Sequence, residues 1–115
     1  MLVLILALAG AALADATITV EKKPGKPLFT HTFPADAPDG AVHLHEQGRW
    51  TWTAVLYLKQ YEDRLETCVD VQRLHPSKGR EEVGRPCVTI EGRETPSALV
   101  EQAAGKIRLA LAVTR

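Results

Sequence analysis

The stretch Trp50–Gln60, WTWTAVLYLKQ, decides the fold class that the sequence predicts. Successive side chains of a β-strand point to opposite faces, so every second residue shares a face. One face of this stretch is hydrophobic throughout and comprises Trp50, Trp52, Ala54, Leu56 and Leu58. The other face mixes hydroxyl, apolar and charged side chains, namely Thr51, Thr53, Val55, Tyr57 and Lys59. The pattern predicts a long strand that buries its tryptophan-bearing face in a core.

Shorter runs of the same kind lie on both sides of this stretch and are separated by glycine and proline. They predict further strands over Thr17–Glu21, Leu28–Phe33, Ala41–Glu46, Leu65–Leu74, Cys87–Glu91 and Lys106–Thr114. Short strands between turn signals favour antiparallel pairing. We therefore expect a mainly β fold, a small antiparallel β-sandwich or barrel of about seven strands.

Two segments between these runs are expected to differ from strands. Ser97–Ala104 is predicted to form one short helix near the C-terminus, with Pro96 at its first position and Gly105 just past its end. Arg73–Pro86, with the sequence RLHPSKGREEVGRP, is predicted to form a long polar loop.

Residues 1–14, MLVLILALAGAALA, carry no charged side chain and end in small residues spaced like a secretory cleavage site. The run is too short to span a bilayer, which takes about 20 residues. We predict a signal peptide over 1–14, with cleavage after Ala14 or Ala16, and a single exported β-domain over 15–115. The mature chain has no further run suited to a membrane span, so we expect a periplasmic or secreted protein.

Length, charge and missing motifs limit the classes of function that the sequence leads us to expect. The chain has 115 residues, 14 basic and 14 acidic side chains, and a formal net charge of zero. This length supports one domain with one core. Balanced charge gives no reason to expect nucleic acid or an anionic membrane as a partner. The sequence also lacks P-loop, nucleophile-elbow and dinucleotide motifs, so we expect no enzymatic activity.

The two cysteines, Cys68 and Cys87, lie in two predicted strands. In an oxidising compartment, an isolated pair is expected to form a disulfide. Closing a loop of this length stabilises the fold by roughly 3 kcal/mol in the chain-entropy model. Period-two alternation puts both cysteines on strand faces opposite the core, so we expect a cross-strand link outside the core.

The loop that this disulfide would close carries the candidate partner-binding side chains Arg73, Lys78, Arg80 and Arg85. We expect the protein to be a binding or structural accessory module of the cell envelope, with an unknown protein or envelope component as its partner. A rigid loop on a sandwich also suits a secreted inhibitor of a hydrolase, although no residue identifies a target enzyme.

His43-Leu44-His45 gives a second candidate site, because two histidines at positions i and i+2 of a strand share a face and can bind one metal ion. The stretch HLHEQG is similar to the HxHExG stretch of copper/zinc superoxide dismutases, which are exported β-sandwiches with one disulfide. The resemblance covers six residues and implies a copper site with His43 and His45 as ligands. Of the further histidines that this family uses downstream, the sequence offers His75 alone.

The residues themselves leave this site open between copper, zinc and no cofactor. A periplasmic copper- or zinc-binding protein is therefore an alternative function. A third ligand would come from His31, Glu46 or His75. We expect the two histidines of the motif to face solvent, with Val42 and Leu44 on the buried face of their strand.

Overall fold

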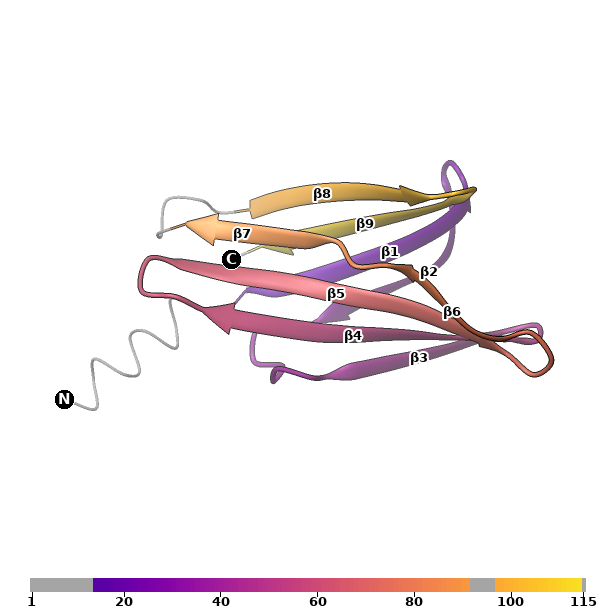
Figure 1. Ribbon diagram of the computed structural model, residues 1–115. Helices are drawn as coiled ribbons and strands as arrows, with labels where there is room; N and C mark the ends of the chain where they lie inside the picture. The colour runs from indigo at the N-terminus through magenta and orange to yellow at the C-terminus, as the bar shows by residue number, and fades with distance from the viewer. Residues whose placement is uncertain (1–13, 92–96, 115) are drawn as a thin grey trace.

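The computed structural model describes residues 14–91 and 97–114 and places them in two antiparallel sheets (Figure 1). The strands of these residues are β1 (Asp15–Lys23), β2 (Lys26–Phe33), β3 (Val42–Gln47), β4 (Trp50–Gln60), β5 (Arg64–His75), β6 (Gly79–Gly84), β7 (Cys87–Glu91), β8 (Ser97–Ala104) and β9 (Ile107–Thr114). The first sheet has the order β2-β1-β9-β8 and the second the order β3-β4-β5-β6, with β7 also paired with β5. The expected mainly β, antiparallel fold is confirmed, with nine strands in the described residues rather than about seven.

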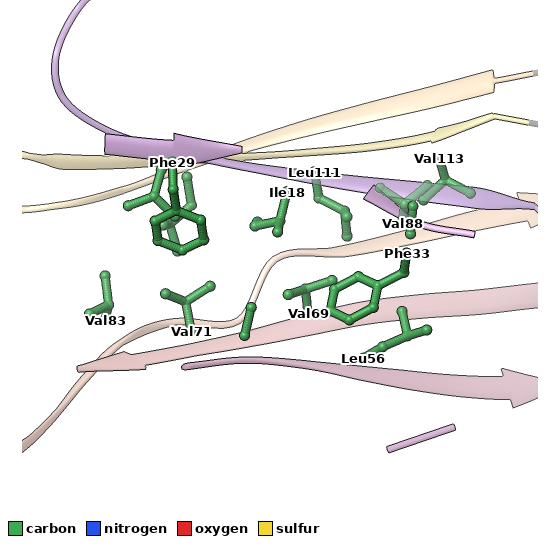
Figure 2. Packing of buried hydrophobic residues seen from close by; sticks show 14 of the residues in the cluster. Ile18, Phe29, Phe33, Leu56, Val69, Val71, Val83, Val88, Leu111 and Val113 are labelled. Carbon is green, nitrogen blue, oxygen red and sulfur yellow. The ribbon is translucent and has the colours of Figure 1, made fainter. Parts of the chain in front are cut away.

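One hydrophobic core fills the space between the two sheets (Figure 2). Ile18 and Leu111 reach into it from the first sheet, and Leu56 and Val69 from the second. All four side chains are at most 2% exposed. Burying a side chain of this size stabilises the fold by about 1.5–3 kcal/mol, so this contact between inner faces dominates the stability of the sandwich.

The period-two pattern of the sequence is confirmed on the strands that form the centre of the sheets. β4 has the bounds predicted for it, and Trp52, Ala54 and Leu56 are buried. β9 also buries every second residue, namely Ile107, Leu109, Leu111 and Val113. These strands have neighbours on both edges, so the inner face of each can be fully covered.

The helix predicted over Ser97–Ala104 is wrong, because this segment forms β8 and pairs along its length with β9. Gly105 has a φ of +63° and begins a two-residue turn that joins Ala104 to Ile107. Pairing as a strand turns Val100 toward the core and leaves Leu99 outside at 63% exposure. Tertiary pairing with β9 therefore overrides the helix signals at either end of the segment.

The long loop predicted over Arg73–Pro86 is also wrong, because most of it forms a hairpin. β5 continues to His75, and β6 begins at Gly79 after a tight turn. Gly79 has a φ of +81°, a conformation that suits glycine and permits the turn. The sequence signals of this turn, Pro76 and Gly79, were present, but the flanking residues are too polar to be predicted as strands.

β6 and β7 share one edge of β5 and are separated by a bend. β6 pairs with residues 71–75 of β5 and β7 with residues 64–68. At the bend, the backbone N–H of Val69 donates a hydrogen bond to the carbonyl of Pro86 (3.1 Å), so β5 keeps a partner between the two strands. The pair therefore acts as one interrupted edge strand.

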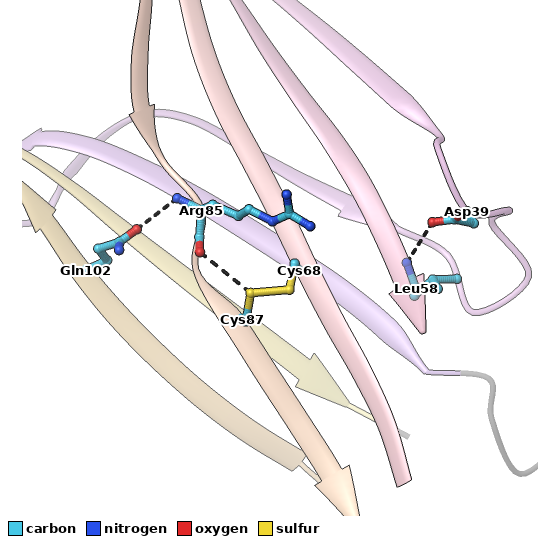
Figure 3. Close-up of a disulfide and its surroundings, with 6 residues drawn as sticks. All are labelled: Asp39, Leu58, Cys68, Arg85, Cys87 and Gln102. Carbon is cyan, nitrogen blue, oxygen red and sulfur yellow. Dashed lines mark hydrogen bonds between the residues drawn. A yellow bond between two sulfur atoms is a disulfide. The ribbon is translucent and has the colours of Figure 1, made fainter. Parts of the chain in front are cut away.

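The same bend is where the edges of the two sheets meet. The backbone N–H of Arg85 donates a hydrogen bond to the side-chain Oε1 of Gln102 on β8 at 3.0 Å (Figure 3). Gly84 makes room for this contact, because a Cβ atom there would lie 2.6 Å from Gln102 Oε1 and 2.8 Å from Leu109 Cδ1. A side chain at this crossing point would force Gln102 and Leu109 to shift.

We predict that Gly84→Ala lowers the free energy of unfolding by about 1–3 kcal/mol, because the added methyl group overpacks the contact between the sheets. Denaturant unfolding of the purified protein measures the change. In a Gln102→Ala background the methyl group gains space, so the penalty should shrink. An equal penalty in both backgrounds would contradict the assignment of the close contact to Gln102.

The predicted signal peptide, 1–14, lies outside the described residues except for Ala14. The described part of the chain contains no helix long and apolar enough to cross a membrane.

Candidate functional site

Cys68 and Cys87 form a disulfide, as the sequence predicts (Figure 3). The two residues are directly opposite each other on β5 and β7, with their Cα atoms 4.1 Å apart. Directly opposite residues of an antiparallel pair point to the same face, and here that face is the outer one, away from the core. Tyr57 is opposite Cys68 on the other edge of β5 and shares this outer face.

The four candidate basic residues separate into two groups. Arg73 is opposite Trp52 and so belongs to the inner face of the second sheet. Its guanidinium carbon lies 4.1 Å from the ring centre of Trp50, and its Nη2 forms an ion pair with Glu81 at 2.9 Å. Lys78 lies near the same ring, with its Nζ 5.9 Å from the centre. Both cations therefore pack around Trp50 at the end of the β5–β6 hairpin.

The other two basic residues lie on the outer face. Arg80 is opposite Leu74, whose side chain points outward and is 46% exposed. The guanidinium carbon of Arg85 lies 4.6 Å from the ring centre of Tyr57, beside the disulfide. The bend between β6 and β7 thus brings Arg85 back over the sheet.

A shallow hollow of about 420 Å³ lies on this outer face. Strands β3 to β6 all contribute to its lining, which includes Leu44, Val55, Tyr57, Asp70, Leu74 and Arg80. The lining is therefore amphipathic, with apolar side chains beside the carboxylate of Asp70 and two arginines, Arg73 and Arg80.

The orientation predicted for β3 is wrong: its histidines face inward and its aliphatic residues face outward. His43 is opposite Ala54 and His45 is opposite Trp52, and both partners belong to the inner face of β4. Val42 and Leu44 are instead 57% and 62% exposed. The register of the β3–β4 hairpin imposes this orientation, because opposite residues share a face.

A sequence signal for this orientation exists in the turn of the hairpin. Gly48 and Arg49 form a two-residue loop that sets Gln47 opposite Trp50. Gly48 has a φ of +62°, which suits the first position of such a loop. Counting back from this pair sets His45 opposite Trp52, so the predicted inner face of β4 already determines where the histidines point.

Inside the sandwich, the histidines of β3 meet aromatic residues of β2. The rings of His31 and His43 stack with their centres 3.8 Å apart and an angle of 8° between their planes. Phe29 stacks on His45 with centres 4.8 Å apart. β2 and β3 are the edge strands of their sheets, so this cluster closes one side of the sandwich. His31 alternates with the buried Phe29 and Phe33 on β2, so it faces the apolar interior and is half-buried.

Burial lowers the pKa of His31 and is also the main reason why the pKa of His43 is lowered. The neighbouring imidazoles of His31 and His45 lower the pKa of His43 further, because a second positive charge beside the first is unfavourable. Both effects disfavour the charged form of the His31 and His43 imidazoles.

The other two candidates for a third metal ligand lie elsewhere. His75 accepts hydrogen bonds at Nδ1 from the backbone N–H groups of Ser77 and Lys78, and so organises the β5–β6 turn. Glu46 is exposed and alternates with the inward histidines on β3. Across residues 14–91 and 97–114, no three His, Cys, Asp or Glu side chains are already arranged to hold a metal ion.

We predict that the free energy of unfolding decreases as the pH falls below about 6.5, the usual pKa of an unfolded histidine. Between that value and the lower pKa values of folded His31 and His43, the unfolded chain binds more protons than the folded chain. The contribution is therefore present above this range and lost as the pH falls through it. Thermal melts from about pH 7.5 to 5 measure the effect.

The matched control is the double variant His31→Phe/His43→Phe, which keeps two stacked rings but removes both titrations. Its melting temperature should depend less on pH over the same range. Parallel curves for the variant and the native protein would show that these histidines do not cause the loss.

Comparisons with protein-family models, with curated proteins and with solved structures found no match for this chain.

Proposed function

We propose that this chain is an exported binding module of the cell envelope that captures a protein partner on the outer face of its second sheet. Binding, rather than catalysis, is the activity we infer for it. The observation that carries the proposal is the group of exposed apolar side chains around the outer hollow. Two arginines of the disulfide-closed segment, Arg80 and Arg85, lie beside this group.

The apolar part of this surface is unusual for a sheet face in contact with water. Val42, Leu44, Tyr57 and Leu74 are between 37% and 62% exposed, and they come from three neighbouring strands. Leu44, Tyr57 and Leu74 line the same hollow. Burying such residues against a partner supplies the main favourable free energy of association.

The charged part of the surface suggests the chemistry of the partner. Arg80 lines the hollow, and in the described residues its guanidinium has no ion pair. Arg85 is held over Tyr57 at the other end. We infer a partner segment that presents apolar side chains with a carboxylate beside them, since a guanidinium pairs well with a carboxylate at an interface.

Capture from envelope extracts, followed by direct titration of each purified candidate, tests this proposal. A partner that binds the native protein should bind Leu44→Ser or Arg80→Glu roughly tenfold more weakly or worse, a loss of about 1.4 kcal/mol. Raising the salt concentration should weaken the native complex, because Arg80 is exposed to solvent.

Lys78→Glu is the matched control, because it reverses a charge on the same hairpin beside Trp50 rather than on the outer face. It should leave both the affinity and the melting temperature nearly unchanged. A partner that loses affinity with Lys78→Glu and not with Arg80→Glu would assign binding to the end of the hairpin and contradict the proposal.

Export is the second part of the proposal and is supported by the predicted signal peptide and by the disulfide, which persists in oxidising compartments. Mass spectrometry of the native polypeptide tests it. We expect a chain that begins after Ala14 or Ala16 and carries no free thiol. An intact N-terminus together with two free thiols would refute export.

A further inference from the structure

The imidazole cluster between β2 and β3 is the group of reactive side chains that the proposed function does not use. It contains His31, His43 and His45, and it lies on the inner side of β3, opposite to the proposed binding face. His31 comes from the first sheet and the other two come from the second. The fold therefore brings His31 of one sheet against His43 of the other, next to His45.

The ring nitrogens of this cluster are largely uncommitted. In the described residues, neither His31 nor His43 makes a side-chain hydrogen bond, whereas His75 makes several. The Nε2 of His45 lies 3.3 Å from the side-chain Oε1 of Gln47, which can only accept. An Nε2–H donor leaves the Nδ1 of His45 with a free lone pair, and metal-binding histidines are oriented by such a contact.

The surroundings select the class of ligand. Phe29 and Phe33 pack against the imidazoles, and Trp52 packs against Phe29. Across their sheets, His31, His43 and His45 are opposite Ile18, Ala54 and Trp52. Arg73 lies beside this apolar shell, over the ring of Trp52, and its charge is paired with Glu81. Three imidazole nitrogen donors suit copper or zinc and do not suit magnesium or calcium.

One ring must turn before the three histidines can share an ion. The lone pair of an imidazole lies in the plane of the ring, and the parallel rings of His31 and His43 direct their lone pairs side by side. Rotation of one ring about its Cβ–Cγ bond changes this direction without moving the backbone. Both side chains are half-buried and come from edge strands, so neither ring is enclosed on all sides.

We propose that His31, His43 and His45 form a three-imidazole site for a copper(II) or zinc ion that links the two sheets across the β2–β3 edge.

Isothermal titration of the native protein without a histidine tag, using zinc chloride and copper(II) sulfate separately, tests this proposal. We expect one equivalent to bind with a Kd of about 10 µM or tighter. His31→Phe and His43→Phe should each weaken binding roughly tenfold or more, because each keeps an aromatic ring in the stack but removes a ligand. The bound ion should also raise the melting temperature, since it binds only the folded chain.

Leu44→Gln is the matched control, because Leu44 lies between two of the ligands on the same strand but points to the outer face. It should leave the metal affinity unchanged. His75 stays in place in every variant, so any binding by that side chain would appear as residual affinity.

Electron paramagnetic resonance of the copper(II) complex counts the nitrogen ligands and does not depend on the folding of any variant. Three equivalent imidazole nitrogens in the native protein support the site. Absence of binding at about 100 µM metal, fewer than three nitrogens, or unchanged affinity in His31→Phe would each overturn it.

Discussion

The pairing of β4 with a neighbour on each edge is the constraint on which both candidate sites depend. In an antiparallel sheet, directly opposite residues share a face, so β4 passes its alternation to β3 and to β5. Its inner face is fixed by the burial of Trp52 and Leu56 in the core. Once this face is fixed, His45 must point inward, and Cys68, opposite Tyr57, must point outward. A slip of one residue in either pairing would exchange the two faces.

The sequence predicts the strands in which hydrophobic residues alternate, including the edge strands β2, β3 and β7, and misses β6 and β8. β4 and β7 have the predicted bounds because hydrophobic residues occupy every second position and turn residues end them. β6 was missed because an edge strand at the end of a hairpin needs little hydrophobic surface, and Val83 is its one buried residue. β8 was missed because its end signals suit a helix equally well, and only the partner strand β9 decides between them.

The two sites differ in how far they could be predicted. The disulfide follows from the alternation within two strands and from the count of cysteines, so the prediction needed no register. The stack of His31 on His43 requires the positions of two edge strands in different sheets, which no local pattern contains. The orientation of β3 lies between these cases. The two-residue turn at Gly48 fixes the register of β3 against β4, but the orientation follows only when the pairs are counted from the turn to the buried residues of β4.

β3 contributes to both proposed binding sites, because its side chains point alternately to the outer face and to the space between the sheets. Val42 and Leu44 belong to the outer surface, and His43 and His45 belong to the space between the sheets. A partner on the outer face therefore would not compete with a metal ion for side chains, although both would act on the same six-residue edge strand. An ion that joins β3 to β2 would restrict the movement of that edge and so would hold Leu44 in place for the partner. Because Leu44 lines the outer hollow directly, the coupling between the two sites would pass through the backbone of β3 and not through contact between ligands.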